Sequence, residues 1–292
     1  MRTSEVLYYG WRIVKWKLGA KSPILAAVKL TYKCNLNCLH CPWVKMKSSE
    51  ISLSEWIDII QAMYDEGVRV IVFEGGEPTL FDGLKELVDF SNSLRMRTVV
   101  VTNGTVDLKG LNPDLLIASI DGPKEIHDTI RGDGVYEQVL KTLSKYDKRK
   151  MSLTTVNKIN YKHLSDMLAE VEKYVDGFAF TLMYNYNKAD KISLNKAEMK
   201  NAYKIIKGFD SHYDILNSVE TLHTEKWECK PWLMLFGTPS GSLTNECFVK
   251  MVPGEADCSS CFLSCYKEIV QLSSGDLNSW YKINKHLFGS QV

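Results

Sequence analysis

The sequence lacks both a long apolar run and a strong net charge. No hydrophobic stretch in its 292 residues approaches the length of a membrane-spanning helix, and the amino terminus has no secretory segment with a small-residue cleavage site. The formal net charge is +1, which argues against a general nucleic-acid-binding protein. Hydrophobic residues make up 45% of the chain, enough for a sizeable core. We therefore expect a cytoplasmic globular protein that does not bind nucleic acid.

Cysteine is absent from the whole middle of the chain. None occurs between Cys41 and Cys229, so the eight cysteines fall into two groups on either side of this gap. A protein in a reducing compartment should not depend on disulfides. Cysteines used as small core residues would be scattered. The two groups therefore indicate two metal sites. They comprise Cys34, Cys38 and Cys41, and then Cys229, Cys247, Cys258, Cys261 and Cys265.

Strand and helix patterns alternate along the central part of the chain. The stretch Ser52-x-x-Glu55 is a capping box, which predicts a helix running to about Glu66. Six strands that alternate with helices predict an α/β fold, a partial (β/α)6 barrel of the TIM type. The predicted strands lie at 26–32, 68–76, 97–104, 115–122, 151–158 and 176–184, and the helices at 52–66, 82–93, 135–147, 163–174 and 195–207.

This pattern divides the chain into three predicted parts. Residues 1–25 form a basic amphipathic segment, residues 26–208 form the barrel, and residues 209–292 form an irregular, cysteine-rich extension. In the first part, apolar side chains at helical spacing lie among basic residues. Such a helix either docks on the barrel wall or makes peripheral contact with the inner face of a membrane. The apolar positions are Leu7, Trp11, Val14 and Leu18, and the basic ones are Arg2, Arg12, Lys15, Lys17 and Lys21, opposed only by Glu5.

Polar and glycine-rich motifs follow the predicted strands. Because active sites of such barrels lie at the carboxyl ends of the strands, these motifs should meet at one mouth of the barrel. Glycines there let the backbone approach a ligand closely. The residues concerned are Gly75, Gly76 and Glu77 after the second strand, Asn103 after the third, Ser119 and Asp121 after the fourth, and Arg131 farther along.

The loop after the first strand carries the spacing C-x3-C-x2-C in "KCNLNCLHCPW", residues 33–43. Three thiolates can hold a [4Fe–4S] cluster and leave one iron open, so the missing fourth ligand is a coordination site for a chelating cofactor. A zinc knuckle with a distant fourth ligand is the alternative. No histidine or cysteine at suitable spacing follows Cys41 closely, which disfavours zinc.

Together, the cysteine loop and the motif Gly75-Gly76-Glu77-Pro78 resemble the radical S-adenosylmethionine (radical SAM) superfamily over about residues 26–185. The resemblance implies an enzyme in which one electron, from a flavodoxin- or ferredoxin-type reductant, splits SAM into methionine and a 5′-deoxyadenosyl radical. It further implies SAM contacts by the strand-end residues. A carboxylate or backbone acceptor at Glu77 would take the methionyl ammonium, and Arg131 would pair with the methionyl carboxylate. Ser119 and Asp121 would bond ribose hydroxyls or the methionyl end, with Asn103 as a second polar contact. The alternatives are that Asn103-Gly104 and Asp121-Gly122 are only turns and that Arg131 is a surface charge.

The extension poses a separate question. Cys247, Cys258, Cys261 and Cys265 can supply four ligands to a second cluster or to zinc, or can remain free thiols, with Cys229 as the expected extra thiol. The stretch "WECKPW" and the cysteine-rich end resemble hopanoid-biosynthesis radical SAM proteins, the adenosylhopene synthases. That resemblance implies a hopanoid- or isoprenoid-type membrane lipid as substrate. The alternative is a radical SAM peptide or cofactor maturase with an auxiliary cluster. We therefore expect a small-molecule or lipid substrate as the partner.

Overall fold

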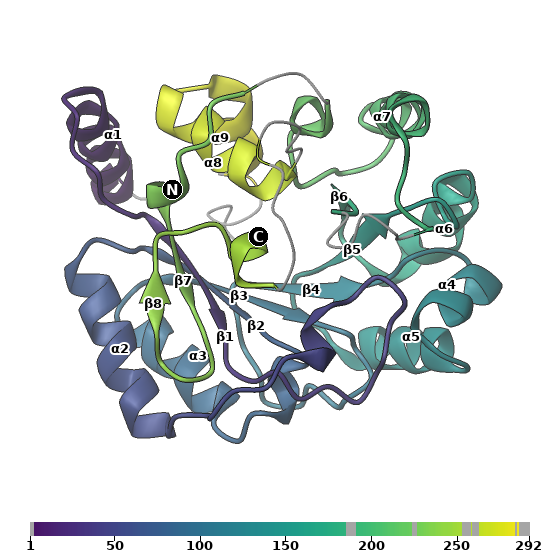
Figure 1. Cartoon of the computed structure of the whole chain (residues 1–292), viewed down its shortest axis with the longest axis horizontal. Helices are drawn as coiled ribbons and strands as arrows, with labels where there is room; N and C mark the ends of the chain where they lie inside the picture. The colour runs from purple at the N-terminus through teal and green to yellow at the C-terminus, as the bar shows by residue number, and fades with distance from the viewer. Residues whose placement is uncertain are drawn as a thin grey trace.

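The computed structural model describes residues 3–184, 191–223, 227–252, 258, 263–283 and 285. Within these ranges the strands form a single eight-stranded sheet of order β6-β5-β4-β3-β2-β1-β7-β8 (Figure 1). All neighbouring strands are parallel except β7 and β8. The predicted partial barrel is thereby confirmed. The strands are β1 (Leu25–Lys29), β2 (Val70–Glu74), β3 (Arg97–Thr102), β4 (Leu115–Ser119), β5 (Lys150–Val156), β6 (Phe178–Leu182), β7 (Met234–Gly237) and β8 (Leu243–Thr244).

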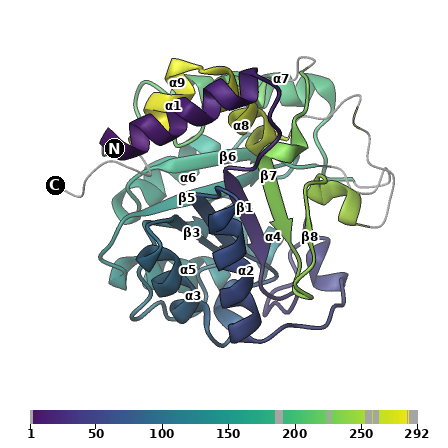
Figure 2. The same cartoon turned by 90° about the vertical axis from the view of Figure 1, so that its left-hand side faces the viewer.

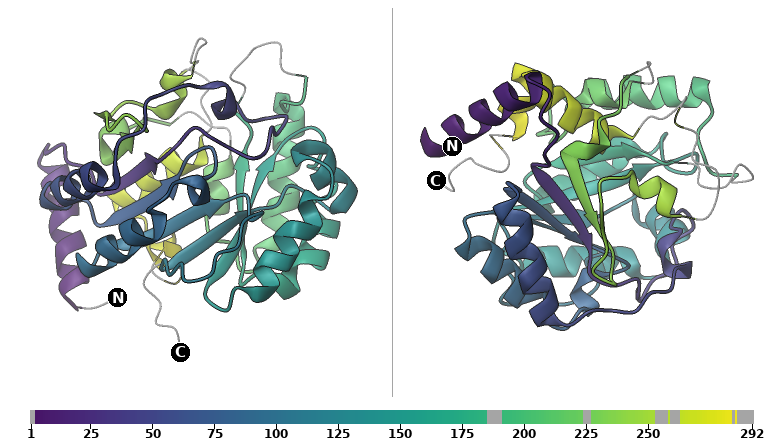
Figure 3. Two further views of the ribbon diagram at one scale, coloured as in Figure 1. Left: turned by 90° about the horizontal axis from the view of Figure 1, so that it is seen from below. Right: turned by 60° about the vertical axis from the view of Figure 1, so that its left-hand side comes forward.

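Helices cover the outer side of the curved sheet (Figures 1 and 3). The capping box at Ser52 is present with both of its hydrogen bonds, and it opens α2 as predicted. One helix over 124–131 was not predicted: it has only eight residues and follows Pro123 directly. The helices of this layer are α2 (Leu53–Asp65), α3 (Leu84–Ser93), α4 (Lys124–Arg131), α5 (Val135–Lys145), α6 (Leu164–Val171) and α7 (Lys196–Phe209).

The main core lies between the sheet and this helical layer. The apolar face of α2 supplies Trp56, Ile60 and Met63, each at most 1% exposed, and the strands beneath supply side chains such as Ile71 and Phe73. Burying a side chain of this size stabilises the fold by about 1.5–3 kcal/mol. The core therefore fixes the strands whose carboxyl ends carry the predicted site.

The carboxy-terminal extension is more regular than predicted. β7 pairs in parallel with β1, with Leu25 opposite Met234, so the extension adds a strand to the barrel sheet. Two helices, α8 (Ser264–Ser274) and α9 (Leu277–Ile283), follow it. The prediction of an irregular extension was wrong for these segments, because a four-residue apolar run such as "MLFG" has no periodicity that marks it as a strand.

Five aromatic rings join the extension to the cysteine loop. Trp43, in the loop, stacks on Tyr32 at 5.9 Å and on Phe236 of β7 at 6.3 Å between ring centroids. Phe248 stacks on Phe236 at 5.7 Å and on Tyr266 of α8 at 5.9 Å. These buried contacts, each worth about 0.5–1.5 kcal/mol beyond area burial, hold the extension against the loop.

Helix α1 (Thr3–Lys17) lies on the outside of the molecule, beside α8 and α9 (Figure 2). Its Tyr8 hydroxyl donates to the carbonyl of Gly67, just before β2, at 2.7 Å. Tyr9 packs edge-on against Trp280 of α9, with ring centroids 5.5 Å apart. These contacts place α1 at the amino ends of the strands. Of the helices in the described ranges, none is long and apolar enough to cross a bilayer.

The segment after β2 packs directly on the entry to the cysteine loop. The amide of Gly76 donates to the carbonyl of Thr31 at 2.7 Å, and that of Glu77 donates to the carbonyl of Lys33 at 2.9 Å. A Cβ on Gly75 would lie 2.5 Å from the Thr31 carbonyl oxygen, and one on Gly76 would lie 2.3 Å from that of Lys33. The glycines are therefore needed for a close approach between two segments of the chain, which we call the glycine strap (residues 75–77).

The glycine strap generates a stability prediction. Gly76→Ala should destabilise the protein by about 1–3 kcal/mol or more, because the added methyl meets backbone atoms that cannot move aside. Gly10→Ala is the matched control: no atom lies within 4 Å of its Cβ position, and it is an exposed helical residue. That change should stabilise by about 0.5–1 kcal/mol. Urea unfolding of both variants would check this, and equal effects at the two positions would contradict the packing described.

A carboxylate in α8 is buried at the joint with the preceding segment. Glu268 is 8% exposed, and its two oxygens accept from the amide of Ser218 at 3.0 and 3.2 Å. Burial raises the pKa of Glu268 to about 8, although the Ser218 amide and Thr221 act in the opposite direction. An unfolded glutamate titrates near pH 4.3, about the model-peptide value. The folded state therefore binds more protons between these values, and stability falls as the pH rises through this window.

Glu268→Gln should remove this pH dependence. The free energy of unfolding of the variant, relative to wild type, should increase as the pH rises from about 5 to about 8, because only the wild type has to ionise a buried carboxyl. Urea unfolding at several pH values measures it. Glu172→Gln, at an exposed position, is the control and should show no such trend. If the difference in free energy of unfolding between Glu268→Gln and wild type is the same at about pH 5 and about pH 8, Glu268 does not titrate in this range.

Candidate active site

A cavity of about 240 Å3 opens at the carboxyl ends of the barrel strands. Of the residues predicted to hold the first cluster and SAM, it gathers all but one, from four different strand ends. The exception is Asp121, which lies behind the cavity wall. The predicted residues that line it are Cys34, Cys38, Cys41, Gly75, Gly76, Glu77, Asn103, Ser119 and Arg131.

The three loop cysteines line this cavity as thiols without disulfides. Burial raises the pKa of Cys38 to about 11, with the charge of Arg131 opposing the rise and the neighbouring thiols adding to it. Burial also raises the pKa of Cys34. In the part of the chain that the structure describes, no three Cys, His, Asp or Glu side chains are close enough to hold one metal ion.

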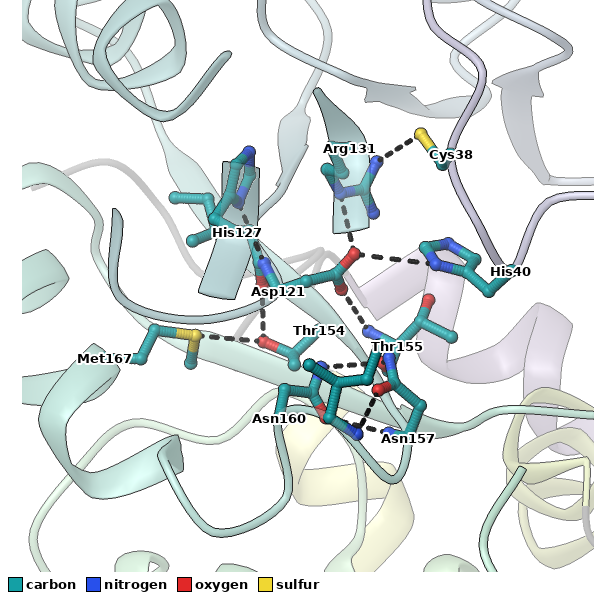
Figure 4. A network of polar contacts seen from close by, with 12 residues as sticks. Cys38, His40, Asp121, His127, Arg131, Thr154, Thr155, Asn157, Asn160 and Met167 are labelled. Carbon is teal, nitrogen blue, oxygen red and sulfur yellow. Dashed lines mark hydrogen bonds and ion pairs between the residues drawn. The ribbon is translucent and has the colours of Figure 1, made fainter. Parts of the chain in front are cut away.

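Arg131 is a buried residue of the site rather than a surface charge. It is 8% exposed; its Nε donates to the Asp121 carboxylate at 2.7 Å, and its Nη1 lies 3.9 Å from the Cys38 sulfur (Figure 4). His40, two residues after Cys38, places its Nδ1 3.8 Å from the same carboxylate. The guanidinium thus joins the fourth strand end to the cysteine loop.

Asp121 is committed to partners within the protein. It is fully buried, and its second carboxylate oxygen accepts from the amide of Thr155 at 2.8 Å (Figure 4). Burial alone would raise the pKa of Asp121, but Arg131 and then His40 bring it below its usual value. We expected Asp121 to contact a ligand, but both of its carboxylate oxygens are already hydrogen-bonded within the protein, to Arg131 and to the Thr155 amide.

His127 shapes the same turn without facing the cavity. Its Nδ1 accepts from the amide of Asp121 at 3.1 Å, and its ring meets Tyr136 edge-on at 5.6 Å. Burial lowers the pKa of His127 to about 4, so the ring is neutral at physiological pH. A neutral ring that accepts at Nδ1 carries its proton on Nε2. The Asp121-Gly122 turn is therefore both a turn and part of the site.

Glu77 is likewise occupied by the protein. Its carboxylate has no exposed surface and accepts from the Thr79 amide and hydroxyl, from the Thr102 hydroxyl and from the Asn103 amide, at 2.7–3.1 Å. The expectation that this carboxylate takes a ligand ammonium does not fit these contacts. The backbone of the glycine strap, which lines the cavity, remains available.

Asn103 connects the third strand end to the cysteine loop. Its Nδ2 donates to Asn35 at 2.8 Å and lies 3.9 Å from the Cys34 sulfur, while its Oδ1 accepts from the amide and hydroxyl of Thr105. Gly104 follows with φ of +72°, a conformation that favours glycine. The Asn-Gly pair is a tight turn, and it also directs an N–H group at a loop sulfur.

The sequence analysis missed a charged pair on the cavity wall. Lys29 ends β1 and Glu74 ends β2, and the two residues are register partners. The Lys29 Nζ lies 3.0 Å from a Glu74 oxygen and 4.1 Å from the centroid of the Trp43 ring. The lysine side chain is 5% exposed and the glutamate 27%. The same strand-end rule that identified the other residues would have found them.

Part of the extension also reaches the cavity, through Phe248 and Leu263. Near Phe248, burial raises the pKa of Cys247, and Tyr266 and Cys258 act on the same thiol. Cys229, Cys258 and Cys265 are exposed. Cys261 lies outside the described residues, so the four predicted ligands of a second site are not all placed.

The chain resembles known proteins over the region that carries these features. The model of the radical SAM superfamily matches residues 28–171. Sporulation killing factor maturation protein SkfB of Bacillus subtilis is 30% identical over 177 residues, which cover 57% of this chain and 43% of SkfB. Fe-coproporphyrin III synthase of Methanosarcina barkeri is 32% identical over 168 residues, 51% of this chain and 42% of that protein. The chain thus spans less than half the length of these two relatives.

Among solved structures, Streptococcus suis SuiB bound to S-adenosylmethionine superimposes with a TM-score of 0.68 over 92% of this chain and 70% of SuiB. At 13% identity, this likeness concerns the fold alone. The resemblance to adenosylhopene synthases is not supported, since these relatives are named for maturation of a sporulation killing factor and for synthesis of Fe-coproporphyrin III. The family match contains both the cysteine loop and the glycine strap, so residues 28–171 belong to the radical SAM superfamily.

Proposed function

We propose that this chain is a radical SAM enzyme that cleaves S-adenosylmethionine reductively and uses the radical to mature a peptide or a cofactor. The observation that carries the proposal is the cavity at the strand ends, in which the three loop thiols face the glycine strap and a charged wall. Membership of the superfamily implies a [4Fe–4S] cluster and SAM as cofactors. A one-electron reductant of the flavodoxin or ferredoxin type is the expected partner.

The residues present fit a cluster held by Cys34, Cys38 and Cys41. All three thiols line one cavity, and two side-chain N–H groups, from Asn103 and Arg131, lie 3.9 Å from loop sulfurs. Hydrogen bonds to cluster sulfurs and nearby cationic groups stabilise a cluster and tune its potential. Such ligands must be thiolates, so binding releases the protons that burial otherwise favours.

When bound, the cluster and SAM supply a 5′-deoxyadenosyl radical by one-electron cleavage of the S–C5′ bond. The chain's own residues then have positioning roles. The backbone of Gly75 and Gly76, together with Ser119, lines the part of the cavity that would hold SAM. Glu77 holds Asn103, and Asp121 holds Arg131, so these carboxylates orient the groups that face the cofactors.

The charged pair on the cavity wall supports a polar substrate. The Glu74 carboxylate, more exposed than Lys29, presents oxygen to the cavity, while Trp43 and Phe248 supply aromatic surface. A carboxylate beside aromatic rings suits substrate N–H groups better than a hydrocarbon. SkfB and Fe-coproporphyrin III synthase, by name a maturation protein and a cofactor synthase, support the same substrate classes. A membrane-lipid substrate has no comparable support.

We also propose that Cys247, Cys258, Cys261 and Cys265 hold an auxiliary cluster. Burial raises the pKa of the Cys247 thiol, Cys258 is close enough to add to this rise, and Cys247 adjoins Phe248 on the cavity wall. Four thiolates suit zinc as well as iron, so the metal itself has to be measured.

Replacing Cys34, Cys38 and Cys41 together with Ala should abolish formation of 5′-deoxyadenosine from SAM and dithionite, because no ligands remain for the catalytic cluster. The anaerobically reconstituted variant should contain about four fewer irons per chain than wild type. Liquid chromatography and iron analysis measure the two quantities. The matched control is Cys229→Ala, which changes an exposed cysteine outside the cavity. It should keep both 5′-deoxyadenosine formation and the wild-type iron content. Product formation by the triple variant would refute the proposed reaction.

The substrate class predicts a second outcome. Deleting the gene from its host should remove one modified peptide or cofactor from cell extracts and leave the membrane lipids unchanged, because the cavity wall is charged. Mass spectrometry of both fractions, with complementation by wild type and by the Cys34→Ala variant, measures this. Loss of a lipid species that only the wild-type gene restores would reverse the assignment of substrate.

A further inference from the structure

Helix α1 carries an unpartnered apolar stripe. The stripe consists of Leu7, Trp11, Val14 and Leu18, which are 69%, 56%, 46% and 80% exposed. Successive members are three or four residues apart, so they lie along one side of the helix. Large apolar side chains scattered singly over a surface are normal, whereas a continuous row marks an interaction site. We call this row the α1 stripe.

The stripe is held outward by the opposite face of the helix. Arg12 is only 7% exposed, donates to the Pro23 carbonyl and lies over the rings of Tyr8 and Trp16 at 5.9 and 5.8 Å. Trp16 donates to the Ser22 carbonyl at 3.0 Å. The sequence left two expectations for this helix, docking on the barrel wall and contact with a membrane. Arg12 and Trp16 dock on the rest of the protein, whereas the side chains of the α1 stripe do not. Because Arg12 is buried, it is not part of the basic surface.

The exposed charged side chains described on α1 and in the segment that follows it are all basic. Lys15, Lys17 and Lys21 are exposed, and none of the three forms an ion pair with another described residue. The Lys15 ammonium lies 5.5 Å from the centroid of the Trp11 ring. Tryptophan and lysine together are typical of helices that lie in the headgroup region of a bilayer.

We propose that the α1 stripe docks this protein on the surface of an anionic phospholipid membrane. The lysines would meet lipid phosphates, and the four apolar side chains would enter the boundary between headgroups and acyl chains. A second copy of the chain fits less well. A stable interface takes about 20–30 residues from each partner, far more than one four-residue stripe offers.

The docking surface and the catalytic cavity lie at opposite ends of the barrel. The contacts of α1 with Gly67 and Trp232 are at the amino ends of β2 and β7, whereas the cavity is at the carboxyl ends. A membrane-bound molecule would therefore keep its cavity open to the aqueous side. The proposal does not rest on the proposed function, since SAM cleavage in solution needs no vesicles.

The test is sedimentation of the full-length protein with vesicles. Wild type should bind vesicles of equimolar phosphatidylglycerol and phosphatidylcholine, and Trp11→Ser/Leu18→Ser should bind at least about tenfold more weakly, because two exposed apolar side chains are lost. Lys15→Glu/Lys17→Glu should weaken binding to a similar extent, and added salt should weaken wild-type binding. As controls, Leu243→Ser replaces one exposed leucine elsewhere and Lys141→Glu/Lys145→Glu reverses two exposed lysines elsewhere, and both should bind as wild type does.

Three results would overturn the proposal. The first is equal binding by wild type and Trp11→Ser/Leu18→Ser. The second is equal wild-type binding to vesicles of phosphatidylcholine alone. The third is a wild-type dimer in light scattering that the double serine variant loses, which would assign the stripe to a second copy. All the changed side chains are exposed, and circular dichroism would verify that the variants are folded.

Discussion

The arrangement of the site depends on the hydrogen bonds that the buried carboxylate of Glu77 accepts. A carboxylate without exposed surface is tolerable only when its oxygens are hydrogen-bonded, and this one accepts from its own loop and from the end of β3. It thereby fixes Asn103, which contacts both Asn35 and the Cys34 sulfur. The two glycines that precede it in the glycine strap pack against the entry to the same loop. The position of the Cys34 thiol therefore depends on the Glu77 carboxylate, through Asn103.

A second buried pair repeats this logic on the other side of the cavity. Asp121 fixes Arg131, and Arg131 reaches Cys38. Two of the three loop cysteines thus have a side-chain N–H group beside them, and in each case a buried carboxylate hydrogen-bonds the residue that carries it. An unpaired buried charge would cost several kcal/mol, so each carboxylate and its partners hold one another in a single arrangement. The carboxylates of Glu77 and Asp121 therefore position other residues, and the groups that they hold line the cavity.

The sequence predicted the parts that local rules govern. Alternation and the Ser52 capping box located the strands and most of the helices, and the strand-end rule gathered the site residues at one cavity. It did not predict the partners of Glu77, Asp121 and Arg131, because a buried carboxylate and a ligand-binding one have the same sequence. It also missed β7, too short to show a period, and the outward direction of the α1 stripe, which depends on tertiary contacts of Arg12.

The pairing of β1 with β7 has a consequence for how the chain acquires its shape. Leu25 and Met234 are neighbours in the sheet but far apart in the chain, so this contact is among the most non-local in the fold. At about 5–20 residues per second, a ribosome takes roughly 10–40 seconds to pass from one to the other. For that time β1, next to the cysteine loop, has an open edge that can pair with another chain. Non-local pairing of this kind slows folding, so this edge is where aggregation during synthesis competes most directly with the native sheet.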